Sequence, residues 1–405
     1  MKKILAVAMT AVGCATIASA GVANSISGIH SVKTHYPWDG KVEINYTSIA
    51  SDGKGYILLD VGPTKRCITL TGEDIAVGNH TKTYDLHEMF GEFKTEVLAS
   101  VAYESSQPPD DAIGTATGIL GDLMTIEVGV DKTEFAVKNY KNVDIGKFNC
   151  DAYKKTKIAL LRIPAGGIWP ARPGSALEET IATTIAPAKE YWISIFPVTQ
   201  WQYTSVIKSP YGSVYEYMTP NPTSYNKIRG GDNDISVLPT ETVKSGSWMD
   251  VLAQKTKLNG KFDLPTEMQW EIAARAGSTA PLGHYVQDGK PVAGKLGEVE
   301  NYAWLISKSG SKLQDVGQLC PNMWGLYDMM GNVYEWCLDQ YEDTAEWTDV
   351  ETPHFRGESN KRVIRGGWYN GGWQDCRPSH RLGKDASISS SNDSYVGFRV
   401  CYMPN

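Results

Sequence analysis

The sequence predicts a mixed α+β protein in which a small all-β domain precedes a loop-rich domain with a few short helices. Short alternating strands fill the first part of the chain, between about residues 31 and 158. Capping signals of three short helices lie in the second part. The tryptophans also divide the chain, because 11 of the 12 fall between Trp169 and Trp373 and only Trp38 lies outside. These patterns together predict a domain boundary near residue 157.

Length and composition narrow the protein class. A chain of 405 residues is expected to hold about two domains. Its 41% hydrophobic and 21% charged residues are typical of a globular protein and not of a disordered one. Nucleic acid is not an expected partner, because the formal net charge is −7 and no cluster of Lys and Arg is visible.

Residues 1–20 are interpreted as a signal peptide. Two lysines follow the first residue, an apolar run extends from Ile4 to about Ile17, and an A-x-A cleavage pattern ends at Ala20. The run is too short to span a bilayer, and no later stretch is apolar enough to do so. Lipidation at Cys14 is the alternative, although the residues before it make a poor lipidation box. We therefore expect a secreted or periplasmic protein, cleaved after Ala20.

The first domain, residues 21–157, is predicted to be a β-sandwich. In residues 41–47, apolar and polar side chains alternate, so that Val42, Ile44 and Tyr46 share one face. Strands separated by turns at this spacing are typical of a small sandwich. Further strands are expected at residues 56–61, 93–103, 123–130 and 133–137.

The second domain, residues 158–405, begins with a predicted strand at residues 159–163 and continues with short helices. Each helix is marked by a residue that can cap its first turn and a polar residue three positions later. The second helix is expected to end at Asn259-Gly260 and the third at Gly277, where glycine favours a left-handed cap. The three capping pairs are Thr199 with Gln202, Ser247 with Asp250, and Thr266 with Gln269.

The order of segments after Leu160 resembles the formylglycine-generating enzyme family, also called sulfatase-modifying factors. The resemblance covers residues 158–402 and implies a fold related to C-type lectins, with little regular structure and many loops. Large side chains would fill the gaps between such loops, so most of the tryptophans are expected in the core. The matching segments are residues 163–167, 191–200, 264–275, 325–336 and 362–367, the step Cys376-Arg377, and residues 397–399.

The catalytic cysteines that the resemblance implies are not both present. Catalytic members of the family bind copper with two cysteines and oxidise a cysteine of a sulfatase to formylglycine, because thiolates suit Cu(I). The first position is Gly371 here, and the second falls at Asp375 or Cys376. Cys376, followed by Arg377, matches a later structural cysteine of the family. Copper is therefore not expected, and the chain is not expected to generate formylglycine.

The resemblance raises the question of two other metals, iron and calcium. A second enzymatic branch of the family holds iron with histidines, but the histidines here show no helical ligand spacing. A structural calcium ion is expected in residues 328–335, because calcium takes carboxylate and carbonyl oxygens. The alternative is that the two carboxylates of this segment only cap turns. The implied ligands are the carboxylates of Asp328 and Glu335 and the carbonyls of Gly331 and Val333.

Six cysteines would remain after cleavage of the leader, and an even number in an exported protein suggests disulfides. Cys67 is expected to pair with Cys150. Two further bridges are expected among Cys320, Cys337, Cys376 and Cys401, with all three pairings open.

The function expected from these observations is non-catalytic binding or scaffolding, with a peptide or a glycan as the ligand outside the cytoplasm. The alternative is a sulfatase-modifying or other protein-modifying oxidoreductase that uses residues not identified here. A third possibility is a binder with a variable ligand loop after Gly367, since residues 387–394 are rich in Ser and Asn. Fold does not decide between these functions. The candidate ligand-cleft residues are Tyr334, Trp368, Tyr369 and Trp373.

Overall fold

The computed structural model describes most of the chain beyond residue 107 and several segments before it. The predicted signal peptide, the side chain of Cys67 and residues 388–394 lie outside the described part. The described residues are 26–34, 41–48, 55–61, 64–70, 72–86, 89, 97–100, 108–165, 169–171, 183–185, 187–208, 217–230, 242–278, 280–288, 290–342, 350, 360–387 and 395–405.

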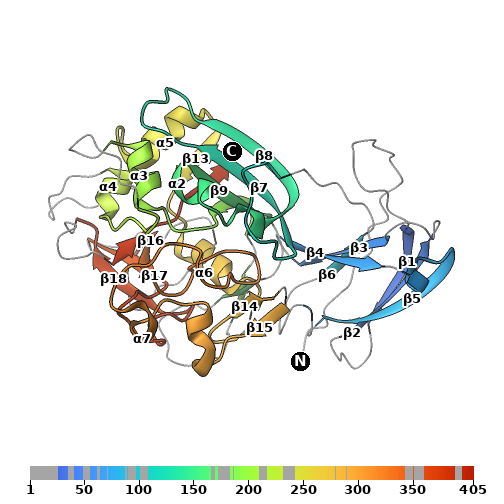
Figure 1. The fold of residues 1–405 in the computed structure, drawn as a ribbon. Helices are drawn as coiled ribbons and strands as arrows, with labels where there is room; N and C mark the ends of the chain where they lie inside the picture. Colours follow the sequence, from blue (N-terminus) through green and yellow to red (C-terminus); the bar gives the residue numbers. More distant parts are fainter. Residues whose placement is uncertain are drawn as a thin grey trace.

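Two layers of strands form the amino-terminal region, at the right of Figure 1. In β2 every second residue is buried, with Val42, Ile44 and Tyr46 at 1% exposure or less, as the alternating sequence predicts. These three side chains share a core with Ile57 and Leu59 of β3 (Gly55–Val61), so the two sheets pack face to face. The first sheet has the order β1 (Ile26–Thr34), β2 (Lys41–Ser48) and β5 (Gly78–Asp85).

The second sheet has nine strands and runs from the amino-terminal region into the rest of the molecule. Its order is β13-β20-β12-β9-β7-β4-β3-β6, with β8 beside β7. The pairings between its strands are antiparallel. Its other strands are β4 (Thr64–Leu70), β6 (Val97–Ser100), β7 (Ile119–Glu127), β8 (Ala136–Asp144), β9 (Lys157–Ile163), β12 (Tyr191–Ser194), β13 (Gly260–Asp263) and β20 (Cys401–Pro404).

The sheet continues across residue 157, where the sequence predicts a domain boundary. Strand β7, in the predicted first domain, pairs with β9 in the predicted second domain, with Leu123 opposite Leu161. β7 also pairs with β4 on the amino-terminal side, with Lys65 opposite Leu120. Residues 119–144 therefore belong to the same sheet as the second domain. The change in tryptophan content marks a change in core composition and not a break in the sheet.

A third sheet of four strands lies in the carboxyl-terminal part, at the lower left of Figure 1. Its order is β18-β17-β16-β19, and β16 pairs with β19 in parallel. Two short two-stranded ribbons accompany it. The bounds are β16 (Tyr334–Gln340), β17 (Lys361–Arg365), β18 (Arg381–Asp385) and β19 (Val396–Gly397), with the ribbons β10 (Trp169–Ala171) and β11 (Thr183–Ile185), and β14 (His284–Gln287) and β15 (Lys290–Ala293).

The helices are short, and the expected capping residues begin three of them. Thr199 before α3 and Thr266 before α6 form full capping boxes, in which each threonine bonds the amide three positions later and receives the reciprocal glutamine. Ser247 caps α5 by accepting the amide N–H of Asp250, whose own carboxylate accepts from Gly246. The helices are α2 (Ala152–Lys155), α3 (Gln200–Val206), α4 (Tyr225–Arg229), α5 (Trp248–Thr256), α6 (Glu267–Arg275) and α7 (Ile306–Ser309).

Two helices end at a left-handed residue other than glycine. α5 ends at a left-handed Lys257 with φ 54°, and not at Asn259-Gly260. α6 ends at a left-handed Ala276 with φ 49°, and the predicted left-handed residue Gly277 follows with φ 83°. Non-glycine residues rarely adopt this conformation, so the surrounding packing fixes both ends more strongly than local preference does.

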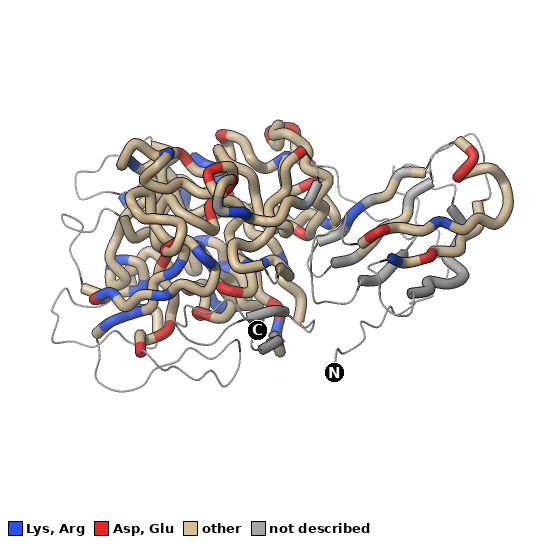
Figure 2. Tube along the Cα trace, turned by 90° about the horizontal axis from the view of Figure 1, so that it is seen from below, with Lys and Arg blue, Asp and Glu red and all other residues tan. Residues whose placement is uncertain are grey.

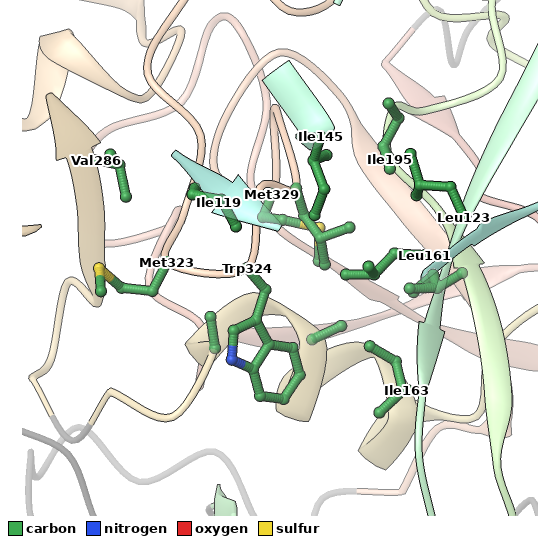
Figure 3. Packing of buried hydrophobic residues seen from close by; sticks show 14 of the residues in the cluster. Ile119, Leu123, Ile145, Leu161, Ile163, Ile195, Val286, Met323, Trp324 and Met329 are labelled. Atoms are coloured by element: carbon green, nitrogen blue, oxygen red, sulfur yellow. The ribbon is translucent and has the colours of Figure 1, made fainter. Parts of the chain in front are cut away.

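The main core packs the nine-stranded sheet against loops. Figure 3 shows Ile119, Leu123 and Leu161 of the sheet facing Trp324 and Met329, which come from loops. Large aromatic side chains fill the space between irregular segments, as the tryptophan content predicts. Among the residues whose burial the structure describes, five tryptophans are buried, namely Trp248, Trp270, Trp304, Trp324 and Trp336.

Buried ion pairs hold α6 to the carboxyl-terminal sheet. Arg381 of β18 donates to both oxygens of Glu267, at 2.7 and 2.8 Å. Arg365 of β17 pairs with Glu271, which also accepts from Arg275 at 2.8 Å. All five side chains are at most 3% exposed. Each buried charge therefore has an opposite charge within hydrogen-bond reach.

In Figure 2, positions of Lys and Arg and positions of Asp and Glu are both spread along the described part of the chain. Among the described segments, no helix combines the length and apolar character that a bilayer crossing requires.

Candidate functional site

The loop after β17 turns sharply because it begins with two glycines. Gly366 and Gly367 have φ of 96° and 77°, a region that favours glycine. A Cβ atom at Gly367 would collide with the sulfur of Cys376, so close approach also requires glycine there. The amide N–H of Gly371 then donates to the carbonyl of Trp368 at 2.9 Å, which closes the next turn. The segment 366–376, here called the Gly-Gly loop, is therefore compact.

Gly371, where the family resemblance places the first copper thiolate, has no room for a side chain. A Cβ atom there would lie 2.7 Å from Cδ1 of Trp368 and 2.9 Å from Oδ2 of Asp375. Atoms at this separation overlap, so any larger residue must displace one of these two side chains. The position that the family uses for chemistry is filled here by an indole ring and a carboxylate.

Three of the four predicted cleft residues lie in one aromatic cluster, which we define as Tyr334, Trp368, Tyr369 and Tyr395. The ring of Trp368 lies 4.7 Å from that of Tyr395 and 5.2 Å from that of Tyr369, centroid to centroid. Tyr334 lies 6.2 Å from Tyr395, edge to face. Tyr334 is buried, whereas the other three rings are half-buried. Part of each of these three side chains is therefore exposed.

The fourth predicted residue, Trp373, lies elsewhere. It packs against a separate group of buried residues that includes Leu282, Tyr302 and Cys376. Tyr395, in contrast, joins the aromatic cluster but was not among the predicted cleft residues. It follows a Ser-rich stretch and precedes β19, and nothing in that local pattern indicates which loop it contacts.

Asp375 and His380 form a second pair that sequence reasoning missed. Oδ2 of Asp375 accepts the amide N–H of Gly372 at 3.1 Å, and Oδ1 lies 3.8 Å from Nε2 of His380. The Asp375 side chain is 37% exposed and that of His380 is 20% exposed. Nδ1 of His380 is buried with no hydrogen-bond partner among the described residues.

Asp375 and His380 both interact with Tyr334 of the aromatic cluster. The ring of His380 lies 6.3 Å from that of Tyr334. Burial raises the pKa of Tyr334, and the charge of Asp375 raises that pKa further. Burial lowers the pKa of His380 from 6.5, and the charge of Asp375 opposes that shift only in part. His380 is therefore neutral at pH 7 and does not neutralise the carboxylate beside it.

The two carboxylates of the expected calcium site are buried, but they have protein partners. Glu335 accepts from Nε of Arg399 with both oxygens at 2.9 Å, and the indole N–H of Trp270 donates to it at 2.7 Å. Asp328 accepts the amide N–H of Gly317 at 2.6 Å.

The Gly331 carbonyl, another predicted ligand of that site, also has a protein partner. The Gly331 carbonyl accepts the amide N–H of Val333 at 2.9 Å. Within the described residues no three His, Cys, Asp or Glu side chains gather as a metal site. Arg399 supplies a positive charge beside Glu335. Calcium stays a prediction that a chelator experiment tests.

The predicted disulfides are absent from the described cysteines. Cys150 is a free thiol whose sulfur donates to the carbonyl of Asp111 at 3.1 Å, so the predicted pairing with Cys67 is not seen in this structure. The other four are also free: Cys320, Cys337, Cys376 and Cys401.

Three of these free cysteines, Cys337, Cys376 and Cys401, are buried. Cys337 and Cys401 belong to the main core, whereas Cys376 belongs to the separate group around Tyr302. Burial raises the pKa of all three thiols, which therefore stay protonated. An even cysteine count is not by itself evidence of pairing, because cysteine also serves as a small buried apolar side chain.

Comparison with known proteins assigns the larger part of the chain to a domain family. A model of the sulfatase-modifying factor enzyme 1-like domain matches residues 150–403. The chain is 27% identical over 194 residues to a formylglycine-generating enzyme of Thermomonospora curvata, covering 45% of this chain and 63% of that protein. It therefore spans less than two thirds of that relative.

Two further proteins, which carry other names, are similar to this chain. The chain is 26% identical over 295 residues to the chaperone protein LppX of Paenibacillus barcinonensis, covering 69% of this chain and 85% of LppX. Among solved structures, it is similar to Treponema denticola variable protein 1, with 24% identity, a TM-score of 0.44, and coverage of 62% of this chain and 96% of that one.

Proposed function

The chain belongs to the sulfatase-modifying factor family, and from this premise we propose that its family domain is a non-catalytic module that binds polypeptides outside the cytoplasm. The observation that carries the proposal is the structure of the Gly-Gly loop. Where catalytic relatives are expected to hold a thiolate, Trp368 and Asp375 pack against Gly371.

The aromatic cluster supports binding at the same place. Trp368, Tyr369 and Tyr395 are half-buried, so each ring keeps an accessible part while the rest is held by its neighbours. Rings held in this way contribute contact area at low conformational cost, which is typical of protein-binding surfaces. A polypeptide presents the apolar and polar groups that such a surface accepts.

The likeness to LppX favours a polypeptide over a glycan, because that relative is named a chaperone and the likeness covers 85% of its length. The amino-terminal pattern of Lys2-Lys3, an apolar run and Ala18-Ser19-Ala20 supports a place outside the cytoplasm. We infer that the natural partner is an exported protein or an unfolded segment of one.

The second candidate is a protein-modifying oxidoreductase. It is favoured by the 27% identity to a formylglycine-generating enzyme over 194 residues. It has the disadvantage that Gly371 replaces the expected first thiol, so the reaction would depend on other residues.

Binding to peptide and glycan arrays tests the first candidate. We expect the purified protein to bind peptides, and Tyr369→Leu to reduce that binding. Tyr217→Leu is the matched control, since Tyr217 is 61% exposed and lies outside the aromatic cluster. Binding to glycans alone, or equal binding by both variants, would contradict the proposal.

Mass spectrometry tests the second candidate. The protein is incubated with a sulfatase-motif peptide, copper and oxygen, and the peptide cysteine is followed. We expect its mass to stay unchanged, because the first thiol is lacking. Conversion of the cysteine to the aldehyde would establish the oxidoreductase and overturn the non-catalytic proposal.

A further inference from the structure

We propose that Asp375 and Trp368 form a subsite for a basic side chain, Lys or Arg, of the bound polypeptide. This inference rests on the proposed function and specifies the chemistry of its ligand. The subsite depends on the carboxylate of Asp375, on the ring of Trp368 beside it and on the charges of the neighbouring residues.

One oxygen of the Asp375 carboxylate accepts no hydrogen bond from the described residues. Its Oδ2 is used by the amide N–H of Gly372, but Oδ1 is 3.8 Å from Nε2 of His380, which is beyond hydrogen-bond distance. Among the described residues, no Lys or Arg forms an ion pair with Asp375. At 37% exposure the side chain is reachable from solvent. A ligand cation would therefore meet an unmatched negative charge.

The indole ring of Trp368 lies beside this carboxylate. Oδ2 of Asp375 and Cδ1 of Trp368 lie at 2.9 and 2.7 Å from the same point, the Cβ position of Gly371. The charge of Asp375 also acts on the hydroxyl of Tyr334. Ring faces attract cations, and the attraction is larger where solvent is partly excluded. Ring and carboxylate together favour an ammonium or guanidinium group over a neutral one.

The aromatic cluster already accepts one ammonium group from the chain itself. Nζ of Lys384 lies 4.9 Å from the ring centroid of Tyr395 and donates to its hydroxyl. Lys384 thus occupies the side of Tyr395 and leaves Trp368 and Asp375 for a ligand. An acidic side chain would be repelled by Asp375, and a neutral His380 does not offset that charge at pH 7.

Binding of three short peptides tests the subsite. They share one sequence and carry Lys, Arg or the uncharged norleucine at the central position. Titration of the full chain should show that Lys and Arg peptides bind roughly tenfold more tightly than the norleucine peptide. Asp375→Asn should abolish this preference, whereas Asp375→Glu should keep most of it. Asp131→Asn is the control, because Asp131 is also an exposed aspartate and pairs with Lys208 outside the Gly-Gly loop.

The effect of pH gives a second readout that a structural role would not produce. The groups that act on His380 are Asp375, which favours its charged form, and Arg365 and Arg377, which disfavour it. Because its pKa lies below 6.5, His380 gains a charge only in acid and then pairs with Asp375. We expect the Lys preference to be weaker at about pH 5 than at about pH 7.5, and His380→Gln to reduce this dependence.

The outcomes separate this inference from the proposed function. Equal binding of the three peptides by a protein that binds them all would overturn the subsite and leave the binding module. A preference that survives in a folded Asp375→Asn variant would also overturn it. Failure of every peptide to bind would overturn both proposals. Thermal unfolding of each variant shows whether it is folded.

Discussion

Strand β2 in the amino-terminal sheet and strand β16 in the carboxyl-terminal sheet bury their residues in different ways. In β2 every second residue is buried and the others stay half-buried or exposed, whereas all seven residues of β16 are buried. The buried residues of β2 are apolar except the terminal Ser48, but β16 also buries Glu335, Asp339 and Gln340. A strand that is covered on both faces must supply partners for its polar groups.

This difference in burial between β2 and β16 shows which interactions stabilise each region. The amino-terminal region relies on apolar packing that strand periodicity provides. The family domain relies in addition on buried charges that are matched pair by pair, as between Glu335 and Arg399. Removing one member of such a pair leaves an isolated buried charge, so the two regions should respond differently to single substitutions.

The largest effect is expected from Arg399→Met. Arg399 is fully buried, and its loss leaves Glu335 without an opposite charge. We expect the free energy of unfolding to fall by about 3–5 kcal/mol, measured by urea denaturation. Arg162→Met is the control, because Arg162 is 37% exposed and its pair with Glu190 should contribute under about 1 kcal/mol. Equal losses in the two variants would remove the distinction between buried and exposed pairs.

A somewhat smaller effect is expected from Ile44→Ala in β2. Ile44 is fully buried against the second sheet, and its truncation leaves a cavity. We expect a loss of about 2–4 kcal/mol in the free energy of unfolding, seen in the same assay. Peptide binding by the family domain should not change. A loss of binding would show that the two regions are more tightly coupled than their different cores imply.

A third effect, about 1–3 kcal/mol, is expected from Gly371→Ala in the Gly-Gly loop. The added methyl group overlaps Trp368 and Asp375. Gly372→Ala provides the matched comparison, because the nearest atom to its Cβ position is the flexible end of Gln374. If Gly371→Ala is no less stable than Gly372→Ala, the loop is looser than described and could hold a larger residue.

The smallest effect concerns calcium. Because Arg399 pairs with Glu335 and Gly317 donates to Asp328, these buried carboxylates have partners without a metal. If the predicted calcium ion is bound, a calcium chelator should lower the melting temperature only slightly, measured by calorimetry, and an unchanged value would count against the predicted site. A fall in the melting temperature that added calcium reverses would establish the site that the family resemblance implies.

Much of the fold could be predicted from the sequence where local patterns decide the structure. The alternation in residues 41–47 predicted β2, and the pairs Thr199 with Gln202 and Thr266 with Gln269 predicted where α3 and α6 begin. The family and the α+β class followed from the order of segments. These features depend on a few neighbouring residues, which is why the sequence alone carries them.

The rest depends on contacts between distant segments. Packing between distant segments determines the pairing of β7 with β9 and the left-handed conformation of Lys257. No local sequence pattern indicates either feature. The site shows the same limit. Trp368 and Tyr369 were predicted, but Tyr395 and the pair of Asp375 with His380 come together only through the folded loops.

The continuity of the nine-stranded sheet determines where the chain can be cut. A shortened protein that starts at residue 158, as the tryptophan distribution alone would suggest, loses β7 and β8. It would expose the edge of β9, where Ala159, Leu160 and Leu161 now face partners in β7. An apolar strand with an open edge pairs readily with other chains. Recombinant versions of the family domain should therefore begin before Ile119 if they are to stay soluble.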